Sequence, residues 1–257
     1  MTRETSRQPR EFLANHPEAE FPLMSFGLKG SKRNVLGGDG FVRLVDFMGD
    51  DAAVVQAARV SYGEGTKTKR EDSALIRYLM KNRHTSPFEM VEFKFHCKMP
   101  MFIARQWVRH RTASINEVSG RYSELPDLFF LPDPDTVTTQ DKKNRQGRTE
   151  KLIPTRVADI AKIKAHNEIG YALYQELLGK GWARELARTH LGVGLYTEWY
   201  WKIDMHNLMG FLALRTDPHA QKEMQDYANA ILELARTVAP VSFEAWDANK
   251  RFWAEYQ

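Results

Sequence analysis

Apolar and polar residues alternate most clearly in two segments, residues 91–99 and 195–203. In both, the odd-numbered positions are apolar or Thr197, and the even-numbered positions are charged, His96 or tyrosine. Because successive side chains of a strand point to opposite faces, this period of two predicts two strands with one face in the core. Residues 41–48 are predicted to form a further strand, the first of the chain.

Helical start signals and apolar stripes occupy much of the remaining sequence. Aspartate or serine residues can cap three of the predicted helices, and Pro100 suits the first turn of another. The predicted helices run from Asp50 or Asp51 to Val60, from Asp72 or Ser73 to Asn82, from Pro100 to Arg111, from Thr155 to Leu178, from Ala183 to Leu191, from Asp204 to Leu214 and from about His219 to Val238.

These elements predict an α+β fold, in which a mixed or antiparallel sheet is flanked by long helices. Strands and helices do not alternate regularly, which argues against a parallel βαβ arrangement. Residues 1–38 are polar and are expected to be an extension, and residues 39–257 a single domain. Residues 133–154 are polar and partly basic, and we expect a long excursion or flexible loop there.

Composition narrows the class of protein. The chain has 257 residues, is 42% hydrophobic and 27% charged, and carries a formal net charge of +4, too small to indicate a nucleic-acid-binding protein. It contains no apolar run long enough for a membrane span and no secretory signal, and it has one cysteine, so we expect a cytoplasmic protein. No histidine pair has metalloprotease spacing, and nothing in the sequence supports a metal site.

The segment from Arg109 to Tyr122 is unusually rich in polar chemistry. It contains three arginines, a histidine, a carboxylate, an amide and two serine hydroxyls before its final tyrosine. Arginine favours bidentate recognition of phosphate, carboxylate or the edge of a heterocycle. On the predicted helix, Arg105 and Arg109 would share one face, and Gln106 and His110 another. The alternative is a solvated, salt-bridged loop after a helix.

Two more arginines are candidates for the same site. Arg215 ends one predicted helix just before Pro218, where it could bind a ligand or simply contact helix carbonyls. Arg188 could bind a ligand or be an ordinary surface charge. Cys97 lies on the apolar face of its strand and is more simply explained as a core residue than as a nucleophile. Ser119 lies among arginines, which cannot accept its proton, so ligand binding suits it better than nucleophilic attack.

The segment from Arg109 to Tyr122 resembles the signature of flavin-dependent thymidylate synthases. Arg109-His110-Arg111, seven residues and then Ser119 match it, and the similarity extends from about Phe41 to Trp246. Further similar segments are Gln106-Trp107-Val108-Arg109, Asn116-Glu117-Val118-Ser119-Gly120-Arg121-Tyr122, His84-Thr85-Ser86-Pro87-Phe88-Glu89, Leu214-Arg215 and His219-Ala220-Gln221.

The resemblance implies a reaction, its cofactors and an assembly. Such enzymes convert dUMP to dTMP with carbon from 5,10-methylenetetrahydrofolate, and FAD reduced by NADPH supplies the hydride. No protein nucleophile is needed, no nucleic acid or membrane is bound, and the enzyme is a homotetramer with active sites between subunits.

The resemblance also implies roles for individual residues. Arg215 is the expected catalytic residue, facing the uracil edge. FAD would be bound by Ser86, Arg109, His110, Arg111 and Glu117, and at the positions of Asp204, His206 and Gly210. The expected dUMP-binding residues are Gln106, Trp107, Val108, Arg109, Glu117, Val118, Ser119, Gly120, Arg121, Arg188 and Arg215.

Two positions depart from the family pattern. Asp204-Met205-His206 stands where the family often has Asn-x-Arg, and Gly210 stands where it has Asn or His. These positions usually touch the cofactor. A competing hypothesis is a nucleotide- or nucleic-acid-binding module without chemistry, which would use the same arginines and the basic segment 142–148. Glu117 argues against this hypothesis, because its carboxylate would repel the phosphate groups of a bound nucleic acid.

Overall fold

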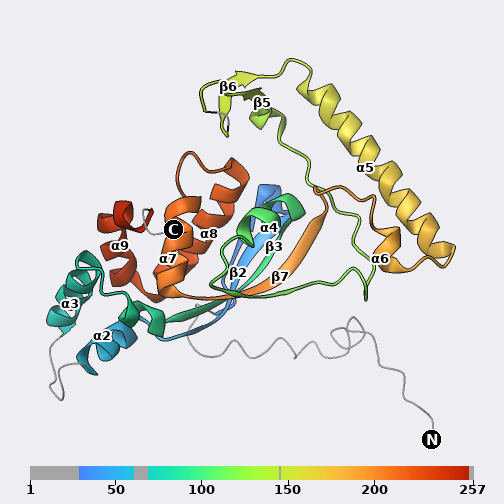
Figure 1. Cartoon of the computed structure of the whole chain (residues 1–257). Coiled ribbons are helices and arrows are strands. Elements are labelled where there is room, and N and C mark those ends of the chain that lie inside the picture. The colour runs from blue at the N-terminus through green and yellow to red at the C-terminus, as the bar shows by residue number, and fades with distance from the viewer. Residues whose placement is uncertain (1–28, 61–68, 145, 255–257) are drawn as a thin grey trace, which may run out of the picture.

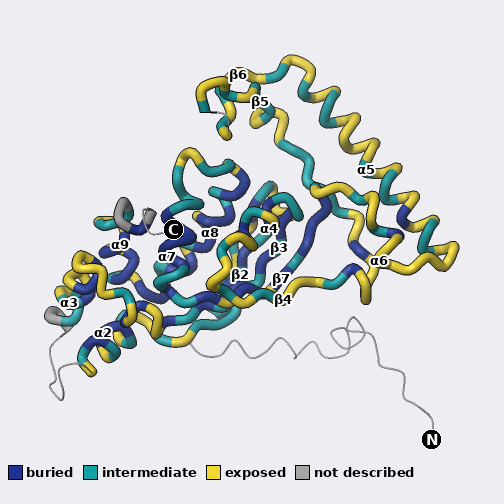
Figure 2. Tube along the Cα trace, viewed as in Figure 1, coloured by how far each residue is buried: buried dark blue, intermediate teal, exposed yellow. Residues whose placement is uncertain are grey.

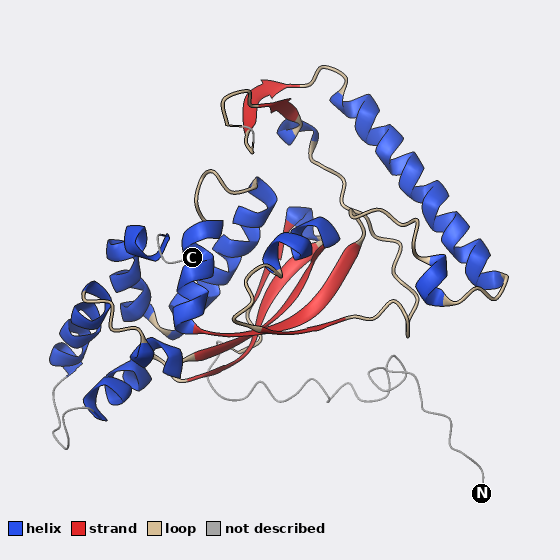
Figure 3. Ribbon diagram, viewed as in Figure 1, coloured by secondary structure: helices blue, strands red, loops and turns tan. Residues whose placement is uncertain are grey.

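An antiparallel five-stranded sheet, in the order β1-β2-β3-β7-β4, organises the chain. The structure is a computed structural model that describes residues 29–60, 69–144 and 146–254. Figures 1 and 3 show the sheet, with helices packed against one of its faces. Its strands are β1 (Lys32–Val35), β2 (Gly40–Met48), β3 (Glu92–Pro100), β4 (Ser114–Glu117) and β7 (Tyr196–Asp204).

The alternation in the sequence sets the two faces of the central strands. All the odd-numbered residues of 91–99 and 195–203 are buried, as predicted. β3 and β7 pair along their whole length, with Cys97 opposite Trp199 and Phe95 opposite Trp201. The apolar face of this pair therefore forms the centre of the core, which appears in dark blue in Figure 2.

Helices cover this apolar face. α4 (Met101–Trp107) and α7 (Met205–Arg215) pack on β7, and α8 (Lys222–Val238) packs on β1 and β2. The Asp204 carboxylate caps α7 by accepting the backbone N–H of Asn207 at 2.9 Å, as the sequence predicted. The other helices at this end of the sheet are α2 (Asp51–Arg59), α3 (Lys69–Lys81), the 3-10 helix η4 (Ser86–Met90) and α9 (Pro240–Ala254).

A long insertion between β4 and β7 stands apart from this core in Figure 1. It contains a short hairpin of β5 (Thr138–Gln140) and β6 (Arg148–Leu152), followed by α5 (Arg156–Gly179) and α6 (Arg184–Ala187). Tyr174 is the one residue of α5 that is fully buried. The described part of the chain has no helix that is both long and apolar enough to cross a bilayer.

The structure corrects several sequence-based expectations. β1 lies inside the predicted extension, of which residues 1–28 are outside the described part of the chain. The excursion 133–154 is not simply a loop, because it contains the β5–β6 hairpin. β4 and α9 were not predicted, and α3 begins at Lys69, so neither Asp72 nor Ser73 caps it. The helix expected to reach Arg111 ends at Trp107.

Candidate functional site

The C-terminal ends of α4 and α7 meet at a contact between His110 and Arg215. The Arg215 Nε–H donates to His110 Nε2 at 3.0 Å. The imidazole also lies edge-on to Phe211, one turn before Arg215 on α7, with ring centroids 4.9 Å apart. The structure thus joins the signature segment to Arg215.

Charge at this contact resides on the arginine. Burial, reinforced by the nearby Arg215 cation, lowers the pKa of His110 to about 4. His110 is therefore neutral at physiological pH, and since its Nε2 accepts a hydrogen bond, its proton lies on Nδ1. Burial also lowers the pKa of Arg215, but a guanidinium remains charged in proteins.

Arg215 has no carboxylate partner among the described residues, although its side chain is half-buried. Its Nε–H is used by His110, which leaves the four N–H donors of its two terminal nitrogens for another partner. A partly desolvated cation without a counter-charge favours an electron-rich ligand. This arrangement makes Arg215 the centre of the candidate site.

The shifted pKa of His110 predicts a pH-dependent contribution to stability. Between pH 6.5 and about 4, unfolded His110 binds a proton that the folded protein excludes, so the free energy of unfolding falls as the pH falls through this window. We expect His110→Asn to reduce this loss, measured by urea unfolding at pH 6.5 and 4.5. Equal slopes for wild type and His110→Asn would contradict the prediction.

Three other expected residues lie along the edge strand β4 and just beyond it. The Thr197 hydroxyl donates to Glu117, and the Val118 N–H donates to the Glu198 carbonyl at 2.9 Å. Ser119 Oγ accepts the backbone N–H of Arg121 at 3.3 Å. These bonds fix the path of the chain where the signature segment leaves the sheet.

Gly120 brings this segment against α6. A Cβ atom at Gly120 would lie 2.9 Å from Arg188 Nη1 and 3.0 Å from a Leu125 methyl group, so a side chain there would displace the guanidinium. Arg121 forms an ion pair with Glu185 at 2.9 Å. Arg188 and Gly120, predicted to bind the same ligand, are thus in direct proximity.

A third group surrounds the beginning of α7. Asp204 is committed to capping, since it accepts both the backbone N–H and the side-chain amide of Asn207. His206 Nδ1 is buried without a hydrogen-bond partner in the described part of the chain, and its ring packs on Trp253 at 4.8 Å. Gly210 is buried within α7, and Ser86 begins η4, which packs on α7. His206 lies nine residues before Arg215, or roughly 13 Å along a helix.

Arg109 and Arg111 follow α4 as exposed residues. Within the residues described, neither guanidinium has an ion-pair or hydrogen-bond partner. Two free guanidinium groups and the orphaned His206 nitrogen fit a ligand that carries phosphates and hydrogen-bonding ring atoms, as FAD does. No group of three or more His, Cys, Asp or Glu residues in the described segments is placed to hold a metal ion.

The expected ligand-binding side chains differ in how far they are buried. Trp107 is fully buried and packs against Trp199, Trp201 and Phe211, so its side chain contributes to the core. Val108 and Val118 are about half-exposed, with 48% and 46% of their surface accessible. Because α4 ends at Trp107, the expected pairing of Arg105 with Arg109 and of Gln106 with His110 on common helix faces is wrong.

A chain of hydrogen-bonded side chains adjoins the site, and the sequence pattern does not predict it. Gln106 donates to Gln221, Gln221 donates to Glu223 at 2.8 Å, and Arg148 donates to both oxygens of Glu223. Gln221 occurs in a family-like segment, but Glu223 resembles an ordinary acidic residue in the first turn of a helix. The burial of Glu223 and its pairing with Arg148 across 75 residues could be recognised only from the fold.

Cys97 is fully buried on the apolar face of β3. Burial raises the pKa of its thiol well above the usual value, the opposite of what a thiolate nucleophile needs. We expect Cys97→Ala to retain near-wild-type kcat for whatever reaction the site performs, with a moderate loss of stability from the lost packing. A folded but inactive Cys97→Ala protein would instead indicate a thiolate mechanism.

Comparison with known proteins identifies the family. Residues 43–241 match the family described as Thy1, thymidylate synthase complementing protein. The flavin-dependent thymidylate synthase of Treponema denticola is 53% identical over 214 residues, which span 82% of this chain and 80% of that protein. The chain belongs to the flavin-dependent thymidylate synthase family. Membership confirms the resemblance, and with it an enzyme of the methyltransferase class with an FAD cofactor.

Other flavin-dependent thymidylate synthases and a solved structure agree. The Thermus thermophilus enzyme is 55% identical over 208 residues, covering 81% of this chain and 76% of the relative. The fold matches a UMP/dUMP methylase PolB from Streptomyces cacaoi bound with 5-Br dUMP, with a TM-score of 0.75 and 34% identity. That match covers 82% of this chain and 95% of the methylase, and it confirms the α+β fold class.

Proposed function

We propose that the protein methylates dUMP to dTMP, with 5,10-methylenetetrahydrofolate as carbon donor, and that NADPH reduces its FAD. The observation that carries this proposal is the half-buried Arg215 cation, held by neutral His110 and left without a carboxylate partner in the described chain. The names of the relatives and the 5-Br dUMP bound to the similar methylase support the choice of substrate.

Arg215 would activate the pyrimidine. Carbon 5 of uracil is a poor nucleophile until electron density moves into the ring, and a fixed cation beside N3 and its carbonyl stabilises that charge distribution. His110 orients Arg215 without competing for a negative charge, because it is neutral. This activation requires no protein nucleophile, in agreement with the burial of Cys97.

The remaining residues divide between dUMP and the cofactor. Arg188, set against Gly120, would hold the nucleotide together with Gln106, Glu117, Ser119 and Arg121. FAD would be held by Arg109 and Arg111, by the unpartnered His206 nitrogen and by Ser86. When bound, FAD supplies the hydride that completes the methyl group.

We also propose that the enzyme is a homotetramer whose sites lie between subunits. Within the described part of one chain, no hydrogen bond or ion pair links the groups around Arg215, Arg188 and His206, so neighbouring copies are expected to complete each site. The insertion also carries exposed apolar side chains that an interface would cover, namely Val157, Ile163, Ile169, Leu173, Trp182, Leu186 and Val193. Light scattering of the purified protein tests this assembly, and a monomer at micromolar concentration would refute it.

Three measurements on the purified protein test the proposed reaction. The purified protein should be yellow, NADPH should bleach it, and tritium should leave dUMP labelled at carbon 5 when the folate donor is added. A colourless protein that takes up no added FAD would count against the proposal. Tighter binding to oligonucleotides than to dUMP, with steep salt dependence, would favour the binding-module hypothesis.

A further inference from the structure

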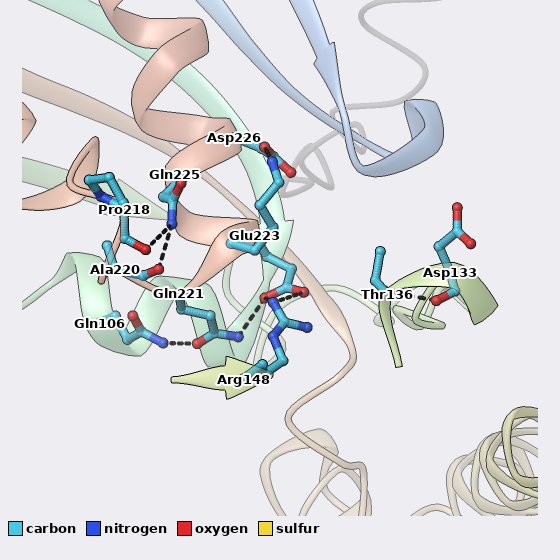
Figure 4. Close-up of polar contacts among 11 residues, drawn as sticks. Gln106, Asp133, Thr136, Arg148, Pro218, Ala220, Gln221, Glu223, Gln225 and Asp226 are labelled. Carbon is cyan, nitrogen blue, oxygen red and sulfur yellow. Dashed lines mark hydrogen bonds and ion pairs between the residues drawn. The ribbon is translucent and has the colours of Figure 1, made fainter. Parts of the chain in front are cut away.

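Glu223 is a nearly buried carboxylate at the start of α8, with 8% of its side chain exposed. It accepts two hydrogen bonds from Arg148 Nη2, at 3.0 and 3.2 Å, and a third from Gln221 Nε2 at 2.8 Å. Figure 4 shows these contacts continuing from Gln221 to Gln106 on α4. A buried charge with several directed partners fixes their geometry more firmly than a neutral group would.

The direction of each hydrogen bond in this chain follows from the carboxylate. An ionised carboxylate can only accept, so Gln221 must turn its amide nitrogen toward Glu223. The Gln221 carbonyl oxygen then faces Gln106, which must supply its own amide nitrogen. Gln106 is left with its carbonyl oxygen as an uncommitted acceptor within the described chain.

Two members of this hydrogen-bonded chain, Gln106 and Gln221, lie close in sequence to the candidate site. Gln106 lies four residues before His110, and Gln221 ends the short connection that begins after Arg215. That connection is held in turn by Gln225, whose side-chain amide donates to the carbonyl oxygens of Ala220, at 2.6 Å, and Pro218, at 3.3 Å. The orientation of Gln106 is therefore set by groups on the same connection that follows Arg215.

We propose that Glu223 is a positioning residue that acts through Gln221 to turn the carbonyl oxygen of Gln106 toward an N–H or O–H donor of the bound nucleotide. Arg148 neutralises Glu223 and thereby anchors the β5–β6 hairpin beside the site. The proposal rests on the proposed function, in which Gln106 contacts dUMP. It assigns a specificity role to three residues that do not themselves touch the reacting atoms.

The test measures dUMP binding to FAD-loaded protein by isothermal titration calorimetry. Glu223→Gln removes the group that dictates amide direction, and the dUMP Kd should rise about tenfold, or ~1.4 kcal/mol. FAD content and the rate of flavin bleaching by NADPH should not change. The matched control is Glu233→Gln, on the same helix, where an exposed carboxylate pairs with Arg33; it should leave the Kd unchanged.

A charge swap separates orientation from general stability. In the double variant Gln221→Glu with Glu223→Gln, the new carboxylate at position 221 accepts directly from Gln106 and from the amide at 223. The direction of the Gln106 amide is thus restored, and the dUMP Kd should return to within about threefold of wild type, since a retained hydrogen bond preserves its contribution. Gln221→Leu, which leaves the Glu223–Arg148 pair intact, should match the loss in Glu223→Gln and serves if that variant does not fold.

Each contrary result identifies what is wrong. A folded Glu223→Gln or Gln221→Leu protein with wild-type dUMP affinity overturns the positioning role. A folded double variant that stays as weak as the single variants overturns the orientation argument. Wild-type protein that binds FAD but not dUMP refutes the proposed function itself, and the role of Glu223 falls with it.

Discussion

Arg215→Ala is expected to lower kcat for dUMP methylation by about 10²–10³, the usual loss when a preorganised charge-stabilising donor is removed. FAD should remain bound, because the proposed partner of Arg215 is the pyrimidine. The side chain is half-buried, held by the neutral His110 ring and free of any carboxylate in the described chain, so its charge is available to a bound ligand. Tritium release from dUMP and the flavin absorbance spectrum measure the two effects separately.

A matched arginine variant checks that the loss is specific. Arg236 is exposed on α8 and pairs with Asp247, so Arg236→Ala should keep wild-type kcat. Arg215→Lys retains the charge but not the planar donor set, and it should recover a minor part of the activity. Loss of flavin from Arg215→Ala with unchanged dUMP affinity would assign the residue to the cofactor.

Trp107→Ala is expected to destabilise the protein by about 3–5 kcal/mol, the range for deleting a large aromatic core residue. The indole packs against Trp201, Phe211 and Trp199, with centroids 5.1, 5.3 and 5.5 Å away, and no part of the residue is exposed. Urea unfolding of the FAD-free protein gives the value. Trp107→Phe should lose less, because a ring remains in the same aromatic cluster.

The same variant decides between a core role and a ligand-binding role for Trp107. Tyr78→Ala, at a position with 55% exposure, is the control and should change the free energy of unfolding by well under 1 kcal/mol. If Trp107 faced dUMP, Trp107→Ala would weaken dUMP binding without a comparable loss of stability. Placing α4 directly against β7 makes the opposite outcome the expected one.

The sequence predicted the centre of the fold better than its edges. β3 and β7 were recognisable because each buries one face over nine residues, which forces a strict alternation. β4 was missed because four residues at an edge, with Ser114, Asn116 and Glu117 exposed, leave too short a pattern. β1 is not predicted for a similar reason: it is four residues long, and Val35 is its one buried residue, so no alternation is visible.

The site was predicted as a set of residues but not as an arrangement. The signature segment and Arg215 could be named from the sequence, yet their contact depends on α4 ending at Trp107, which lets His110 turn toward α7. Burial also distinguishes the members, and it places the Trp107 side chain in the core. Glu223 and Arg148 could not be found from spacing, because packing brings the hairpin to the start of α8.

The pairing of β4 with β7 has an evolutionary consequence. These neighbours in the sheet are joined by a stretch that runs from residue 118 to residue 195, closed at its base by the ladder from Ser114–Lys202 to Glu117–Trp199. The entropy of closing such a loop grows only slowly with its length. Insertions and deletions in this stretch can therefore accumulate without shifting the register of the sheet, provided that the residues around Arg148 and Arg188 still reach their contacts.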